Sequence, residues 1–191
     1  MKPLIEKHIQ ESAQVTASLL GSATKIEQIS RELVKVVLNG GRIYSCGNGG
    51  SSCDAMHLTE ELVARYKRER PGIPAHHLCD AGTITCWSND YDFTGVFSRQ
   101  VETLVTNKDA LICFSTSGNS PNILSALKAG KTVGALTIAF LGKGGGEAAR
   151  LCSHSLVVAS DITAHVQEAH IVLVHILCEL LENSLFPASQ P

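Results

Sequence analysis

Five short, continuously apolar segments alternate with stretches of helical periodicity, and this alternation constrains the fold more than any other feature of the chain. The predicted strands are 42–46 (RIYSC), 74–78 (PAHHL), 109–116 (DALICFST), 136–142 (LTIAFLG) and 154–159 (HSLVVA). Strands that are apolar at consecutive positions are typically buried on both faces of a sheet. The sequence therefore predicts an α/β fold with a single doubly wound, parallel, five-stranded sheet covered by helices on both faces.

Helical segments are expected before, between and after these strands. They cover residues 4–20 and 24–38, about 50–68, a stretch that begins near Pro121, and about 163–185. The second of them ends at Asn39-Gly40-Gly41, which is a C-cap signal. We therefore expect a helical hairpin over residues 1–40, followed over residues 41–191 by an α/β core with a long C-terminal helix. Residues 1–191 are expected to form a single domain, in which only the final PASQP is loose.

Composition and charge argue against several classes of protein. The formal net charge of −2 gives no electrostatic basis for binding nucleic acid or an anionic membrane. Basic residues gather only at 65–70, where we expect a solvated helix end. The longest apolar run, HIVLVHILCELL, is interrupted by His and Glu and is too short to span a bilayer. Seven cysteines without a CxxC pair indicate reduced thiols, most of them in or near the core, so we expect a soluble, cytoplasmic protein.

Two loops that follow predicted strands have the composition of phosphate-binding turns. One is Gly47–Ser52 (GNGGSS), and the other is Ser115–Asn122 (STSGNSPN), in which Ser120 precedes Pro121 as a predicted helix N-cap. Ligands of such sheets bind beyond the carboxyl ends of the strands, where helix N-termini favour anions. Either loop alone is more often a plain capped connection. Neither matches a nucleotide-binding fingerprint, so the expected ligand is the phosphate of a small metabolite.

Polar side chains at helical spacing form a second group of candidates. Asp54, His57, Glu61 and Arg65 are expected to lie along one helix face, which by itself is more typical of a surface ion pair than of a metal site. The apolar final helix carries Gln167 and His175, and each could equally be a hydrogen-bonded core residue. Two histidines, a glutamate and a glutamine could nevertheless converge on a divalent ion. His170 points elsewhere on that helix, and we interpret it as a core histidine.

Four segments together resemble one known family. They are CGNGGSSCDAMHLTEELVARY, SNDYDFTGVFSRQVE, STSGNSPNIL and VQEAHIVLVHIL, and they resemble in order and spacing the bacterial phosphoheptose isomerases, which have the flavodoxin-like sugar-isomerase (SIS) fold. The resemblance covers nearly the whole chain. It implies interconversion of sedoheptulose 7-phosphate and D-glycero-D-manno-heptose 7-phosphate, a step toward the heptose of lipopolysaccharide. It also implies a homotetramer with a divalent ion, usually zinc, in each active site.

The resemblance also implies roles for particular residues. Zinc would be bound by His57, Glu61, Gln167 and His175, and the substrate by Asn48, Gly49, Gly50, Glu61, Asn89, Asp90, Ser115, Thr116, Ser117, Ser120 and Gln167. Glu61 and His175 would serve as base and acid. Because a carboxylate bound to zinc is a weaker base, either Glu61 changes its coordination during turnover or Asp90 assists. One departure from the family is His165, where Arg or Lys is usual.

A non-catalytic reading remains the alternative. The same family contains a regulator that binds the replication initiator protein as a tetramer, and that branch lacks the acid of the HxxxE pair and the last histidine. This chain keeps both Glu61 and His175. The resemblance therefore favours the isomerase.

Overall fold

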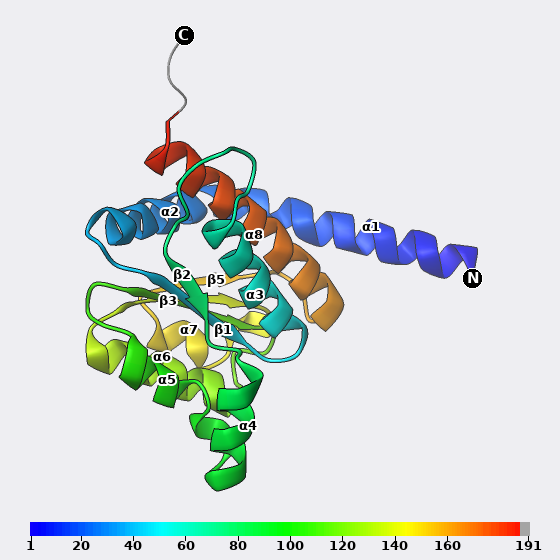
Figure 1. Ribbon diagram of the computed structural model, residues 1–191. Helices are drawn as coiled ribbons and strands as arrows, with labels where there is room; N and C mark the ends of the chain where they lie inside the picture. The colour runs from blue at the N-terminus through cyan, green and yellow to red at the C-terminus, as the bar shows by residue number, and fades with distance from the viewer. Residues whose placement is uncertain (188–191) are drawn as a thin grey trace.

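The computed structural model describes residues 1–187 (Figure 1). Residues 188–191, which make up most of the PASQP segment predicted to be loose, lie outside the described part. The α-helices are α1 (Lys2–Ser18), α2 (Ala23–Leu38), α3 (Gly50–Val63), α4 (Ala81–Asp90), α5 (Ser98–Leu104), α6 (Pro121–Val133), α7 (Ala148–Leu151) and α8 (Thr163–Leu185). The strands are β1 (Ile43–Gly47), β2 (Ala75–His77), β3 (Ala110–Ser115), β4 (Leu136–Leu141) and β5 (His154–Val157), and short 3-10 turns lie at Leu19–Ser22, Phe93–Gly95 and Lys143–Gly145.

All five strands are parallel and lie in the order β2-β1-β3-β4-β5. The predicted α/β fold with a doubly wound, five-stranded parallel sheet is confirmed. After β1 the chain moves to one edge of the sheet, and after β3 it moves toward the other edge. The carboxyl ends of β1 and β3 therefore flank a topological switch point, which is where ligands bind in sheets of this type.

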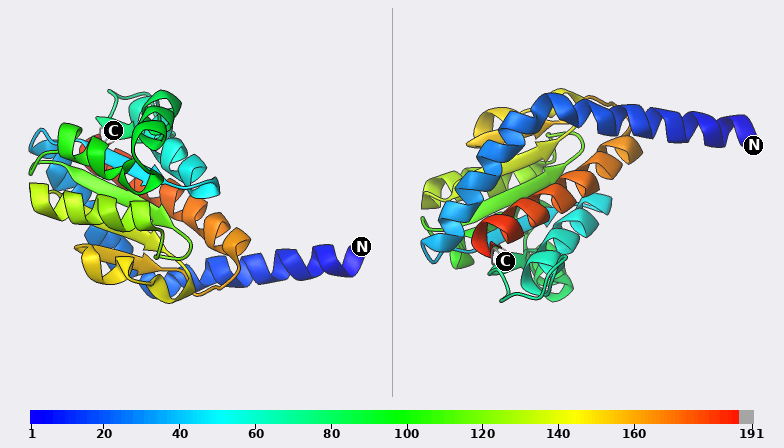
Figure 2. Two further views of the ribbon diagram at one scale, coloured as in Figure 1. Left: turned by 90° about the horizontal axis from the view of Figure 1, so that it is seen from below. Right: turned by 90° about the horizontal axis from the view of Figure 1, so that it is seen from above.

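The two faces of the sheet pack against different helices, as Figures 1 and 2 show. One apolar cluster joins α2, α3 and α8 to strand residues such as Ile43 and Ile112. The other joins α5, α6 and α7 to the intervening residues, such as Tyr44 and Leu111. Successive strand residues point to opposite faces, so the central strands β1, β3 and β4, which are buried almost throughout, must be apolar at nearly every position. This requirement explains the continuous apolar runs.

Helix α8 lies in the centre of one helical layer. By length and composition it could cross a membrane, since it has 23 residues and a mean hydropathy of 1.3 over its most apolar window. However, its buried side chains, including Leu173 and Leu177, belong to the core cluster that contains the sheet, α2 and α3. These contacts identify it as a core helix, in agreement with the prediction from sequence.

The predicted N-terminal helical hairpin is wrong. The backbone stays helical from Ser18 into the 3-10 turn that leads to α2, so the chain bends there without reversing direction. Helix α1 therefore packs on α8 and projects beyond the body of the molecule, as Figure 2 shows. Three apolar side chains near its free end, Leu4, Ile5 and Ile9, are exposed.

The helix predicted over residues 50–68 ends earlier, at Val63. Beyond this point the chain is irregular and is fastened by Glu182 of α8, which accepts hydrogen bonds from the backbone N–H groups of Lys67 and Arg68 at 3.3 and 3.1 Å. The Arg70 side chain is 1% exposed and pairs with Glu182 at 3.1 Å. The basic cluster at 65–70 is therefore partly an internal ion-pair network, contrary to the expectation of a solvated helix end.

Three short helices, α4, α5 and α7, were not predicted. Helix α4 begins at an Asp80 N-cap, whose carboxylate accepts a hydrogen bond from the N–H of Thr83 at 2.7 Å. All seven cysteines are free thiols, as predicted, but Cys53 and Cys86 are exposed and do not fit the expected near-core position.

Candidate active site

The two glycine- and serine-rich loops lie side by side at the switch point. They follow β1 and β3, which are neighbours in the sheet with Gly47 opposite Phe114. Together with the start of α8 they enclose a pocket of about 270 Å³. Its lining consists of Asn48, Gly49, Gly50, Ser51, Phe114, Ser115, Thr116, Ser120, Thr163 and Gln167. Seven residues predicted to bind substrate are thus brought to one pocket: Asn48, Gly49, Gly50, Ser115, Thr116, Ser120 and Gln167.

Backbone geometry explains the glycines of the first loop. Gly49 is the N-cap of α3 and has φ +57° and ψ −124°, a conformation that residues with a side chain rarely adopt. A Cβ atom on Gly47 would lie 2.2 Å from the carbonyl oxygen of Ser51. The loop is tied to α6 by Asn48 and Asn122, whose amides exchange two hydrogen bonds of 2.8 Å. A tight, braced turn at the mouth of the pocket results.

The pocket is suited to an anion although none of the described residues that line it is charged. Helices α3, α6 and α8 all begin at it, with Gly50, Ser120 and Thr163 at or next to their first turns. The first N–H groups of a helix have no partner within the helix and carry the positive end of its dipole. Ser120 is the N-cap of α6, as predicted, but within residues 1–187 its hydroxyl makes no capping bond. That hydroxyl is therefore available to a ligand.

A second set of polar groups lies between α3 and α8. The Nε2 atom of His57 is 3.3 Å from the Oε1 atom of Glu61 and 3.3 Å from the Nε2 atom of His175. The ring of Tyr66 stacks on that of His175, with centroids 6.0 Å apart. One donor atom from each of His57, Glu61 and His175 lies within 4.8 Å of the others. Three of the four predicted metal ligands therefore converge.

The donor set fits a divalent metal ion. Zinc bound by histidine and carboxylate has bonds of about 2.0–2.2 Å, so tetrahedral geometry places its ligand atoms roughly 3.3–3.5 Å apart. The two 3.3 Å separations at His57 match this spacing. Two imidazole nitrogens and one carboxylate oxygen also form the donor set typical of zinc sites with an open position.

Gln167 lies apart from these three residues, at the other end of the site. A Cβ atom on Gly50 would fall 2.4 Å from its Nε2 atom, so the amide lies against the first turn of α3. His57 is seven residues further along α3, which corresponds to about 10 Å of helix. In this arrangement Gln167 belongs to the anion pocket.

Four other candidates lie outside both groups. Asn89 and Asp90 are exposed at the end of α4, where the amide of Asn89 donates to Asp90 at 2.9 Å. The hydroxyl of Ser117 accepts a hydrogen bond from the N–H of Asn119 at 3.2 Å. Arg65 pairs with Glu69 at the surface. None of these four residues is among the described residues that line the pocket.

Asp54 does not follow the predicted polar stripe, because it is buried. Its Oδ2 atom lies 3.9 Å from the Nδ1 atom of His170, and neither atom has a hydrogen-bond partner within the described residues. Burial raises the pKa of Asp54 to about 7, and the charge of His57 only partly offsets this effect. Burial also lowers the pKa of His170 to about 4. His170 is a core residue, as predicted.

Sequence reasoning missed Asn122 and Thr163. Asn122 lies in the predicted loop Ser115–Asn122, but nothing in the sequence shows that its amide braces Asn48 of the other loop. Thr163 opens α8, but nothing in the sequence shows that this helix begins at the same pocket.

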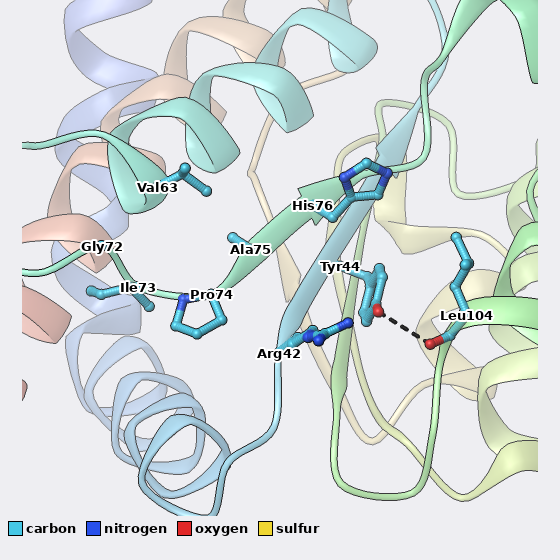
Figure 3. A pocket seen from close by; sticks show the side chains of 9 residues that line it. All are labelled: Arg42, Tyr44, Val63, Gly72, Ile73, Pro74, Ala75, His76 and Leu104. Atoms are coloured by element: carbon cyan, nitrogen blue, oxygen red, sulfur yellow. Dashed lines mark hydrogen bonds between the residues drawn. The ribbon is translucent and has the colours of Figure 1, made fainter.

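A separate hollow of about 520 Å³ lies along the edge strand β2, as Figure 3 shows. Tyr44 lies in it and donates a hydrogen bond from its hydroxyl to the carbonyl oxygen of Leu104 at 3.1 Å. Its described lining contains no carboxylate and no predicted site residue. The candidate site is therefore restricted to the pocket at the switch point and the adjoining His57, Glu61 and His175.

Comparison with known proteins agrees with this geometry. The family model described as "SIS domain" matches residues 8–142. The chain is 45% identical to phosphoheptose isomerase 1 of Campylobacter jejuni over 185 residues, which are 95% of this chain and 98% of the relative. It is 41% identical to the phosphoheptose isomerase of Clostridium acetobutylicum over 191 residues, covering 97% of each chain.

Solved structures give the same result. A phosphoheptose isomerase from Francisella tularensis superposes with a TM-score of 0.91 at 34% identity, covering 95% of this chain and 97% of the other. The enzyme from Neisseria gonorrhoeae gives a TM-score of 0.89 at 32% identity, covering 95% and 98%. The chain therefore belongs to the SIS-domain family and, within it, to the phosphoheptose isomerases, which are aldose–ketose isomerases.

Proposed function

We propose that this protein converts sedoheptulose 7-phosphate to D-glycero-D-manno-heptose 7-phosphate through an enediol. The observation that carries the proposal is the arrangement on α3, which begins at a neutral anion pocket and carries His57 and Glu61 two to three turns later. A heptose 7-phosphate has its phosphate at one end and its reacting carbons at the other. The two halves of the site match those two ends.

The phosphate is assigned to the pocket at the helix N-termini. The hydroxyls of Ser115, Thr116 and Ser120, together with the N–H groups that open α3 and α6, can surround its oxygens. Gln167 lies against Gly50, and its amide can bind hydroxyl groups along the sugar chain. Because no charged side chain from the described part of the chain lines this pocket, the helix dipoles and neutral donors hold the anion.

The reacting carbons are assigned to the other half of the site. Isomerisation removes a proton from C1 of the ketose, passes through an enediol and returns a proton to C2. Glu61 is placed to take and return the carbon-bound proton, and His175 to move the hydroxyl proton between O1 and O2. Asp90, the other candidate base, lies at the exposed end of α4. The geometry therefore favours Glu61.

A divalent ion, zinc in the first instance, is proposed to be bound by His57, Glu61 and His175. Since a carboxylate bound to zinc is a weaker base, Glu61 would have to change its coordination during turnover in order to act as the base. When bound there it would polarise the sugar carbonyl and stabilise the enediolate oxygens. From the family resemblance we further propose that the protein is a homotetramer. By the same resemblance it acts in the cytoplasm, at the first step toward the heptose of lipopolysaccharide. The exposed apolar side chains of α1 are consistent with self-association.

The test is an isomerase assay of purified, zinc-supplemented protein, with metal content measured in parallel. The wild-type chain should convert the ketose, and His57→Ala should lose its activity together with the zinc ion of this site, so that its zinc content falls below that of the wild type. His76→Ala provides the control, since that histidine is exposed on β2. A wild-type protein that binds zinc but turns over no substrate would overturn the proposal and favour the non-catalytic regulator. Unchanged zinc content in His57→Ala would overturn the ligand assignment alone.

A further inference from the structure

A second cluster of histidine and carboxylate side chains lies where α1 crosses the start of α8. The Nε2 atom of His8 is 3.1 Å from the Oε1 atom of Glu168, and the Nδ1 atom of His165 is 2.9 Å from its Oε2 atom. One donor atom from each of these three residues lies within 4.8 Å of the others. None of them belongs to the candidate active site described above.

The cluster has the arrangement of a metal site more than that of an ordinary ion pair. Two imidazoles converge on the two oxygens of one carboxylate, with ring centroids 4.6 Å apart. The Nε2 atom of His165, on the far side of its ring, faces the Oε2 atom of Glu11 at 3.6 Å. A carboxylate behind a ligating imidazole fixes its tautomer and orientation in many metal sites. Elsewhere in the fold, His154 and Glu32 form a simple pair at 3.0 Å with no second imidazole.

The environment also suits a site that forms part of the structure. His165 is 2% exposed at its side chain, whereas His8 and Glu168 are open to solvent, which leaves a path for an ion. Within the described chain, α1 contributes no fully buried residue to the core. Its position on α8 therefore depends on contacts such as these. Apolar burial anchors α1 only weakly, through partly buried side chains such as Val15, so a metal ion bound by both helices would add a firmer anchor.

We propose that His8, His165 and Glu168 form a second divalent-cation site, which takes zinc or a similar imidazole-binding ion and fastens α1 to the first turns of α8. Imidazole nitrogens suit zinc, nickel and copper, and a carboxylate completes a three-residue set. Glu11 orients His165 from behind. The ion acts structurally and supplies no chemistry to the isomerisation.

The experiment measures zinc per chain after metal-stripped protein is reloaded and unbound ion is removed. The wild type should hold about two ions per chain and His8→Gln about one, because three protein ligands are needed for a stable site. His8→Gln preserves a polar side chain on an exposed helix face, so the fold should survive. His154→Gln is the matched control, since it removes a histidine paired with only one carboxylate, and it should keep the wild-type content.

The same substitution in a His57→Ala background separates the two sites. His57→Ala should hold about one ion per chain and the double variant almost none. Any zinc bound by cysteine thiols is the same in every variant, so it does not affect these differences. Zinc should also slow amide hydrogen exchange in α1 of the wild type and of His57→Ala, but not of His8→Gln. Equal zinc content in the wild type and His8→Gln, or in His57→Ala and the double variant, would overturn the proposal. So would zinc-independent exchange in α1 of the wild type.

Discussion

Replacing Glu182 with alanine should destabilise the protein by about 3–5 kcal/mol, which is the usual cost of leaving one partner of a buried ion pair without its counter-charge. The Glu182 side chain is 3% exposed and that of Arg70 is 1% exposed. Burial works against ionisation of Glu182, but hydrogen bonds from the backbone and from the guanidinium groups of Arg68 and Arg70 hold its pKa below the ordinary value. The carboxylate is therefore charged in the folded protein at neutral pH.

The loss of stability in Glu182→Ala should also affect the C-terminal turn of α3, which contains Glu61. The guanidinium of Arg70 donates to the carbonyl oxygens of Glu61 and Leu62 at 2.8 and 2.9 Å, so it caps the last turn of that helix. Without Glu182, the Arg70 charge remains buried and two backbone N–H groups lose their acceptor. These consequences all act in the same direction, which places the expected loss at the upper part of the range.

Denaturant unfolding followed by circular dichroism, at a fixed chain concentration, measures this loss. Glu179→Ala is the matched control one turn earlier on α8. Its carboxylate pairs with Lys67 at 2.9 Å, but both side chains are about half exposed, so the loss should stay below about 1 kcal/mol. If Glu182→Ala were no less stable than Glu179→Ala, the argument for a buried ion-pair network would be wrong.

Two further substitutions test the site and its buried surroundings. Gly50→Ala should leave the fold intact but displace the amide of Gln167, and we expect kcat/KM to fall about 10–100-fold. Gly21→Ala is the control, because a Cβ atom there would meet no described atom within 4 Å. Equal activities of the two variants would contradict the assignment of Gln167 to the site. Asp54→Asn tests the buried carboxyl, whose pKa near 7 exceeds the value of about 3.9 in an unfolded chain. Protonated Asp54 therefore contributes stability that is fully present below about pH 4 and is lost as pH rises through 7. Asp54→Asn has no carboxyl to ionise and so cannot lose this stability. Between about pH 4 and 7 its unfolding free energy should therefore rise relative to that of the wild type by at most about 4 kcal/mol. Parallel plots of unfolding free energy against pH for the two proteins would refute the raised pKa.

The sheet could be predicted because local sequence determines it. The central strands β1, β3 and β4 are buried on both sides and are therefore largely apolar, so their pattern is visible without knowledge of their neighbours, whereas the edge strands β2 and β5 are partly exposed. Helix α6 was predictable because its start signal, Ser120 followed by Pro121, is local, and its two glycines have structural roles. Gly134 ends the helix with φ +81°, while a Cβ atom on Gly130 would lie 2.8 Å from the side chain of Thr137 on β4.

The errors arise where distant residues decide the outcome. Helix α3 ends at Val63 because Glu182, more than a hundred positions later in the sequence, holds the segment that follows. In the site, the spacing of His57 and Glu61 predicted their pairing on one helix face. The spacing of Gln167 and His175 could not show that they would contact different turns of α3, the first turn and the middle of the helix.

Those contacts belong to a continuous polar seam between α3 and α8. Gly50 lies against Gln167, Asp54 faces His170, His57 meets His175, and the segment after α3 ends on Glu182. In these contacts the residue numbers increase in the same direction along α3 and α8, so the two helices run parallel. This is the direction expected for helices that follow strands of a parallel sheet. The seam is costly, because Asp54 and His170 each leave a buried polar atom without a partner among residues 1–187, at about 1–3 kcal/mol apiece. An apolar seam would pack two helices more stably, so the polar one is best explained by the site it builds, with an anion pocket at its start and a metal-type donor set two turns along.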